Sequence, residues 1–180
     1  MLSRGVCLPP RRAAALCFSF LLLLAAAPGV GARGGGVSRA MDFELRDQYG
    51  KPLAYRFPKE RVSVLVFGDR KGSEQVEGWV RPVFERYEGR VDLHGVAVLN
   101  SIPSLFRGYA RRQFKQQIKY PVLLDFEGDV SKGYGYERDR ANVYVIARDG
   151  TVVYKATGAA TPDGLGRVYA ELDRLLGARR

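Results

Sequence analysis

The sequence predicts an α/β domain in which a central mixed sheet carries helices on both of its faces, a three-layer arrangement. Residues 62–67 are an almost continuous β-branched and apolar run, typical of a strand buried on both faces of a parallel sheet. Residues 76–87 place their apolar side chains on one helical stripe, so a helix follows this strand. The Asp-Gly pair at 149–150 separates two strand-like runs, which indicates a closing antiparallel hairpin.

The first elements of the domain are predicted from their periodicity. Residues 42–57 alternate apolar and polar around a turn at 48–52, so we expect an edge hairpin or two short strands. The buried strand over 62–67 then leads into a helix. Ser73 is its expected N-cap, and Pro82 is expected to kink it.

The middle of the chain continues with strands and helices in alternation. The helix is expected to end at Gly89, and residues 91–99 form the next strand. A second helix is predicted over 102–119, followed by a short strand over 120–125. Residues 129–136 are expected to form a turn or a short helix.

The last elements are a hairpin and a helix. Strands over 143–147 and 151–156 flank the Asp-Gly turn, and a cap followed by proline opens a helix at 161–163. Gly177 is expected to end that helix. Because β-α-β crossovers are right-handed, the first strands are expected to run parallel, and the hairpin then adds antiparallel strands.

The first 32 residues have the three-part pattern of a secretory signal. Arginines precede an apolar run over 13–27, and small residues follow at 30–32. The run is shorter than the roughly 20 apolar residues that span a bilayer. We therefore expect a cleaved signal peptide over 1–32, a flexible lead-in over 33–40, and one domain over 41–178 exported to the periplasm or the extracellular space. An uncleaved N-terminal anchor is the alternative.

Cysteine usage limits the chemistry of the domain. The only cysteines are Cys7 and Cys17, and both lie within the predicted signal peptide. Lipidation at Cys17 is not expected, because Leu16 precedes it instead of a small residue. The predicted domain therefore has no thiolate nucleophile, no disulfide and no thiolate metal ligand.

Three segments, taken in order, resemble the redoxin branch of the thioredoxin-like proteins, which includes peroxiredoxin-like and TlpA-like members. The first is VSVLVF at 62–67, followed by GDRKGS at 68–73 and the helix with Pro82. The second is YPVLLD at 120–125, and the third is NVYVIARDGTVVYKATG at 142–158. The resemblance implies a thioredoxin-like fold.

The sequence departs from the family at the redox site. In that family the two redox cysteines lie between the buried strand and the kinked helix. Counting back from the helix proline places them at Glu74 and Glu77, whereas counting forward from the buried strand places them near Gly72 and Gln75. Neither register contains a cysteine. The family's cis-proline falls on Ala141, where a trans bond is expected, because a cis bond there would cost about 2.5–4 kcal/mol.

The resemblance and the missing thiols together predict a redox-inert binding or accessory module, not an enzyme. The expected docking surface for a protein or peptide partner is the degenerate active-site loop with the groove beside it. Its candidate residues are Asp69, Arg70, Lys71, Ser73, Glu74, Glu77, Ala141 and Asn142. A redoxin-type thiol oxidoreductase or peroxidase is the alternative from resemblance alone, and the absent low-pKa thiolate argues against it.

Three smaller features have competing interpretations. Residues 69–73 precede a helix, where backbone N–H groups and two cations would hold an anion, or they form a solvated loop. Glu74 and Glu77 form an acid/base pair, or they are first-turn carboxylates that the helix dipole favours. His94 is the only histidine and has no visible partner ligand, so we expect a strand residue near a sheet end, no metal and no cofactor.

Basic residues recur along the helix predicted over 102–119. They are Arg107, Arg111, Arg112, Lys115 and Lys119. We expect them opposite an apolar stripe of Ile102, Leu105, Phe106 and Tyr109. Removal of residues 1–32 takes away three arginines and lowers the net charge from +10 to +7. The stripe would bind an anionic membrane surface, a polyanion or an acidic protein, or it is a solvated face. Nucleic acid is not expected for an exported protein without a recognisable module.

Overall fold

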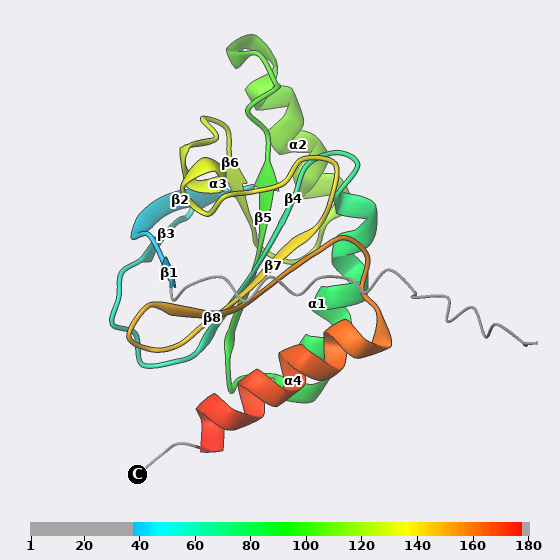
Figure 1. The fold of residues 1–180 in the computed structure, drawn as a ribbon. Helices are drawn as coiled ribbons and strands as arrows, with labels where there is room; N and C mark the ends of the chain where they lie inside the picture. Colours follow the sequence, from blue (N-terminus) through cyan, green and yellow to red (C-terminus); the bar gives the residue numbers. More distant parts are fainter. Residues whose placement is uncertain (1–37, 178–180) are drawn as a thin grey trace, which may run out of the picture. The chain divides into compact units, whose positions relative to one another are not determined.

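The computed structural model describes residues 38–177 (Figure 1). The predicted signal peptide and residues 33–37 of the predicted lead-in lie outside the described residues. Residues 38–177 belong to one compact unit, whose hydrophobic clusters draw only on residues 40–176. A fragment over 33–180 therefore contains this whole core. Within the described range, no helix combines the length and apolarity needed to cross a membrane.

Eight strands form one mixed sheet with the order β1-β8-β7-β4-β5-β6-β2-β3. Their bounds are β1 Ser38–Arg39, β2 Phe43–Asp47, β3 Pro52–Tyr55, β4 Ser63–Gly68, β5 Asp92–Val98, β6 Val122–Asp125, β7 Asn142–Ile146 and β8 Thr151–Thr157. The central strands β4, β5 and β6 run parallel. The β2–β3 and β7–β8 hairpins are antiparallel, and each joins the sheet antiparallel to its neighbour. The predicted mixed sheet is confirmed.

Helices cover both faces of the sheet, as predicted. Their bounds are α1 Ser73–Tyr87, the 3₁₀ helix η1 Ser104–Phe106, α2 Arg107–Gln117, α3 Asp129–Gly133 and α4 Pro162–Gly177. The helices α1 and α4 lie alongside each other on one face, where Trp79 and Leu172 meet valines of β4 and β7 (Figure 1). The same face continues under α2 through Ala97 and Leu124. On the opposite face, α3 packs with aromatic residues of β2, β3 and β4.

Two elements differ from the sequence prediction. The lead-in predicted over 33–40 is ordered at its end, because Ser38 and Arg39 pair with β8 and Ala40 is buried. The helix predicted over 102–119 is not continuous. It starts as η1 and becomes α-helical only at Arg107. This break changes which side chains of the segment face the sheet.

Candidate functional site

The C-terminal ends of β4 and β5 border a groove of about 720 Å³. Residues 69–71 of the loop that joins β4 to α1 line one side of it, and residues from 98–101, 127–132 and 136–139 line the rest. Strand β4 has β5 on one side and β7 on the other, so the sheet connections diverge at this point. Open α/β sheets bind their ligands outside the carboxyl ends of the strands at such a place.

The carboxylate of Asp69 organises the loop at the start of α1. Its oxygens accept hydrogen bonds from the backbone N–H groups of Lys71 (3.1 Å), Gly72 (2.9 Å) and Asp139 (2.8 Å). Partial burial raises the pKa of Asp69, but these backbone hydrogen bonds outweigh it and hold the pKa below its usual value. An external anion at these N–H groups would therefore have to displace the protein's own carboxylate.

Ser73 does not cap α1 as predicted. Gly72 is the N-cap residue, and no side chain caps the helix there. The hydroxyl of Ser73 instead donates to the carbonyl oxygen of Arg70 (2.8 Å). The reason is that Asp69, one turn earlier, already accepts from the N–H groups that precede the helix.

Gly72 and Gln75 join the start of α1 to the segment that precedes β7. Gly72 is buried, and a Cβ built on it would lie only 2.4 Å from the carbonyl oxygen of Arg140. The side-chain oxygen of Gln75 accepts from the N–H of Ala141 (3.1 Å). The bond before Ala141 is trans as expected, since the one cis bond within residues 38–177 is Phe57–Pro58. No side chain longer than hydrogen fits at position 72 without movement of the 140–141 backbone.

Glu74 and Glu77 lie on the exposed side of α1, away from this contact. A carboxylate oxygen of Glu77 accepts two hydrogen bonds from Arg81, at 2.8 and 2.6 Å. The two possible pairs of cysteine positions therefore lie at different places on α1. Gly72 and Gln75 lie against residues 140–141, whereas Glu74 and Glu77 face solvent.

Ala141 and Asn142 are fully buried, so their side chains do not line the groove. The amide of Asn142 accepts from the N–H of Glu137 and donates to the carbonyl oxygens of Glu137 and Arg140, at 2.8–3.1 Å. These three bonds fix the loop between α3 and β7. Asn142 therefore holds the loop whose residues 136–139 line the groove, and it offers no free polar group to a partner.

Sequence reasoning missed the residues that β5 and the α3 region contribute to the groove. They include Asn100, Asp129, Lys132, Tyr136, Arg138 and Asp139. The hydroxyl of Tyr136 accepts from the backbone N–H of Asp69 (2.9 Å), and burial raises the pKa of this tyrosine. The sequence does place polar residues directly after the strands predicted over 91–99 and 120–125, and these could have indicated a site. That they lie next to the 69–72 loop depends on the tertiary structure.

The charges of the groove are only partly paired. Lys71 forms an ion pair with Asp139 (3.3 Å), and Glu127 is bound by Arg107. In the part of the chain that the structure describes, Arg70, Lys132 and Arg138 line the groove without an ion pair. Asp129 also lines the groove without an ion pair among the described residues, and backbone N–H groups hold the Asp69 carboxylate, so the unpaired cations of the groove outnumber its free carboxylates.

The basic residues of α2 do not form the exposed stripe that the sequence predicted. Arg107 and Arg111 are half-buried, and their guanidinium groups lie 5.4 and 5.9 Å from the centre of the Phe126 ring. Lys115 lies over Tyr49 at 5.8 Å. Arg112, Lys115 and Lys119 are exposed.

The apolar stripe of this segment is also reversed in part. Ile102 packs against the core as expected. Leu105, Phe106 and Tyr109 are exposed instead, and Ala110 and Phe114 take the inner side of α2. The expected arrangement is therefore wrong for these three side chains, because η1 and α2 do not form one continuous helical stripe.

His94 lies near the start of β5, as expected, at the end of the sheet opposite the groove. Its Nδ1 is hydrogen-bonded to the hydroxyl of Tyr55 (2.6 Å). Burial lowers the pKa of His94, and the nearby Lys59 ammonium lowers it further against the opposing effect of Asp92. Among residues 38–177, no three His, Cys, Asp or Glu side chains gather as they would around a metal ion.

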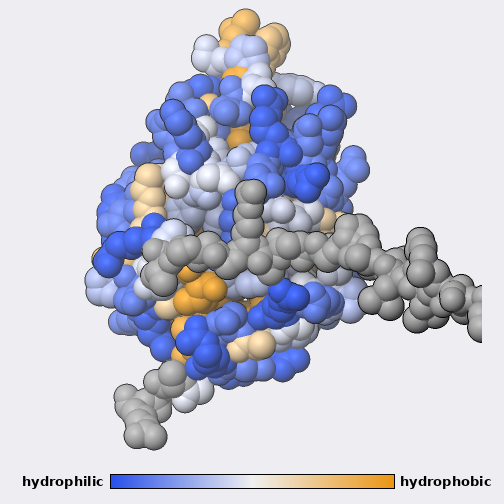
Figure 2. Space-filling view, in the orientation of Figure 1, coloured by the Kyte–Doolittle hydropathy of each residue, from blue (hydrophilic) through white to orange (hydrophobic). Residues whose placement is uncertain are grey.

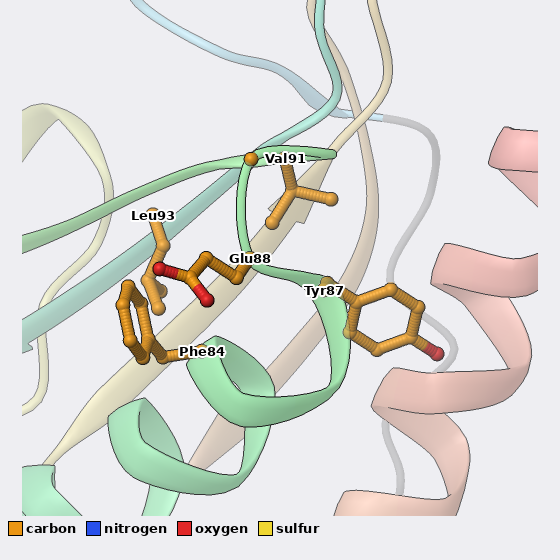
Figure 3. A pocket seen from close by; sticks show the side chains of 6 residues that line it. Phe84, Tyr87, Glu88, Val91 and Leu93 are labelled. Carbon is orange, nitrogen blue, oxygen red and sulfur yellow. The ribbon is translucent and has the colours of Figure 1, made fainter.

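A second, smaller hollow of about 100 Å³ lies between the end of α1 and the start of β5 (Figure 3). Phe84, Val91 and Leu93 border it, and the Glu88 side chain lies between them (Figure 3). Tyr87 points towards α4, where its hydroxyl donates to Asp173 (2.8 Å). Sites for small organic ligands measure about 300–1,000 Å³, so this hollow is too small for one.

This chain has a thioredoxin-like α/β fold, which confirms the fold that the resemblance in the sequence implies. No model of a known protein family matches the sequence. No curated protein matches it either. Solved structures of thioredoxin-like redoxins do match it at low identity.

A putative thiol:disulfide interchange protein DsbE from Chlorobium tepidum superposes with a TM-score of 0.60 at 21% identity, covering 78% of this chain and 97% of that one. The exposed lipoprotein thioredoxin of Streptococcus pneumoniae has a TM-score of 0.60 at 19% identity, covering 73% and 100%. Peroxidoxin BcpB from Mycobacterium tuberculosis has a TM-score of 0.53 at 18% identity, covering 80% and 97%. At these identities the likeness defines the fold alone.

Proposed function

We propose that this chain is an exported, redox-inert thioredoxin-like module that binds an acidic polypeptide segment in the groove at the ends of β4 and β5. The contact between Gly72 and the Arg140 carbonyl carries the redox-inert part of the proposal. It fills the space next to Ala141 with backbone atoms, so position 72 has no room for a reactive side chain. The chain's cysteines, Cys7 and Cys17, both precede the described domain.

The binding part rests on the lining of the groove. Its volume of about 720 Å³ accommodates several side chains of an extended segment. Arg70, Lys132 and Arg138 supply cations that pair with no acid of the described domain. Guanidinium groups bind carboxylates through paired hydrogen bonds, which favours acidic side chains in the bound segment.

The binding part is tested by site-specific photocrosslinking in cells that produce the full chain. A photoreactive phenylalanine derivative replaces Ser101 or Asp129, which line the groove and are not among its cations. As a control it replaces the exposed Arg90, which precedes β5 at the opposite end of the sheet. We expect discrete crosslinked species from the groove positions and none from position 90. The same pattern from all three positions would refute groove binding.

The competing function is a redoxin-type thiol oxidoreductase or peroxidase. Those reactions need a thiolate of low pKa as nucleophile. Peroxide consumption and disulfide reduction by purified residues 33–180 are expected to equal a buffer blank. A rate clearly above that blank would overturn the redox-inert assignment. It would not affect the test of groove binding by crosslinking.

A further inference from the structure

Three exposed apolar side chains form a projecting tip where η1 meets α2. We call Leu105, Phe106 and Tyr109 the apolar tip, and their exposed fractions are 84%, 55% and 62%. Figure 2 shows hydrophobic side chains gathered at the projecting end of the molecule, above α2 in Figure 1. Single exposed apolar side chains are ordinary, but adjacent ones on a projection mark an interaction surface.

The tip is not a misplaced part of the core. Ala110 and Phe114 already fill the inner side of α2 against β5 and β6. The side chains of the tip therefore have no remaining place against the sheet. Tyr109 lies one helical turn from Arg112, so an exposed cation follows the apolar residues on the outer side of α2.

The charge around the tip has one sign. No Asp or Glu occurs between Asp92 and Asp125, and this stretch carries all five basic residues of the α2 region. Glu127 is the acid that reaches them, and it is bound by Arg107. Arg112 remains exposed one helical turn from Tyr109, whereas Lys119 follows the other end of α2; the protein without residues 1–32 has a net charge of +7.

We propose that the apolar tip inserts into the interface of a membrane rich in anionic phospholipid, with Arg112 on the headgroup phosphates. The tip projects and encloses no groove, so it suits a deformable bilayer surface. Leucine and phenylalanine enter the boundary of the acyl chains, and tyrosine places its ring there with its hydroxyl in the headgroups. A basic residue near an anionic membrane surface contributes about 1 kcal/mol, which is about fivefold in binding. This site is separate from the groove and does not depend on the proposed function.

The test is cosedimentation of residues 33–180 with phospholipid vesicles. This fragment contains the whole core and lacks the apolar run over 13–27, which would bind membranes by itself. Vesicles of phosphatidylcholine are compared with vesicles of phosphatidylcholine and phosphatidylglycerol. We expect the fragment to bind the anionic vesicles, and to bind neutral vesicles at least about fivefold more weakly, because the exposed Arg112 lies next to the tip.

Three variants separate the contributions. The double variant Leu105→Ser/Phe106→Ser is expected to bind anionic vesicles at least about tenfold more weakly, because it removes the inserted apolar area. Arg112→Glu is expected to weaken binding more than about fivefold. Phe84→Ser, which changes another exposed aromatic residue on α1, is the matched control and is expected to change little. Circular dichroism confirms that each variant is folded.

Several outcomes would overturn the proposal. They are equal binding by the wild type and the Leu105→Ser/Phe106→Ser variant, equal binding to neutral and anionic vesicles, no binding at all, or an equal loss in Phe84→Ser. Analytical ultracentrifugation tests a second copy as the occupant. A dimer in solution that the double variant abolishes would assign the tip to self-association instead.

Discussion

Replacing Gly72 with alanine is expected to destabilise the domain, although a change from glycine to alanine at an unstrained position usually stabilises a protein. The backbone of Gly72 has φ −61° and ψ −27°, a conformation that alanine adopts without strain. Reduced freedom of the unfolded chain would therefore favour the variant by about 0.4–1 kcal/mol. Against this, the new Cβ would lie 2.4 Å from the Arg140 carbonyl oxygen and 2.7 Å from its carbon.

The clash is expected to outweigh the gain. Overpacking of a rigid site costs about 1–3 kcal/mol. The free energy of unfolding should therefore fall by about 1–2 kcal/mol, which lowers the urea midpoint by roughly 0.5–1 M. Trp79 is the only tryptophan and is 2% exposed, so its fluorescence reports the unfolding of the core around α1.

Gly108 provides the matched control. It lies in α2, and nothing stands within 4 Å of a Cβ built on it. Gly108→Ala is expected to raise the free energy of unfolding by about 0.5–1 kcal/mol. If Gly72→Ala raised the urea midpoint as Gly108→Ala does, the close contact with Arg140 would be refuted. The argument that position 72 excludes a cysteine side chain would fall with it.

Three further predictions concern single side chains. Asp69→Asn should lower the free energy of unfolding by about 1–2 kcal/mol, since charge-assisted hydrogen bonds to three N–H groups are weakened. The pKa of Asp69 is lowered in the folded protein, so its stabilising effect is present above about pH 3.9 and is lost as the pH falls through the folded pKa. The free energy of unfolding should therefore decrease less on acidification in Asp69→Asn than in the wild type. The pKa of His94 is also lowered, so below about pH 6.5 the unfolded chain binds a proton that the folded protein does not. In urea titrations below that pH, the free energy of unfolding should therefore decrease more for the wild type than for His94→Gln. Trp79→Phe should cost about 1–3 kcal/mol by far-ultraviolet circular dichroism, because the Gly158 carbonyl loses its indole donor (2.8 Å); an unchanged melting curve would contradict this role.

Most elements of the fold follow from local sequence patterns. The buried run over 62–67 formed β4, the alternating segment over 42–57 formed the β2–β3 hairpin, and the Asp-Gly turn joined β7 to β8. Each pattern expresses a local requirement, such as burial of both faces of a strand or a turn at a fixed position. Such requirements are read within a few neighbouring residues, so they predict elements well.

The orientation of side chains in the α2 region did not follow from its pattern. A 3₁₀ helix has 3.0 residues per turn, whereas an α-helix has 3.6. The change from η1 to α2 at Arg107 therefore shifts the phase of the stripe. Leu105 and Tyr109 turned outward for this reason, and Arg107 and Arg111 turned towards Phe126.

The sequence by itself determined the strands and helices of this protein and the absence of cysteine after position 17, because periodicity and composition need no knowledge of distant neighbours. Only the tertiary structure decided that the Asp69 carboxylate also accepts from the backbone N–H of Asp139, and that Gly72 lies against the Arg140 carbonyl. These contacts join residues about 70 positions apart in the chain, a separation set by how β4 and β7 pair in the sheet. No local pattern records such a distance, since it arises from sheet pairing and packing.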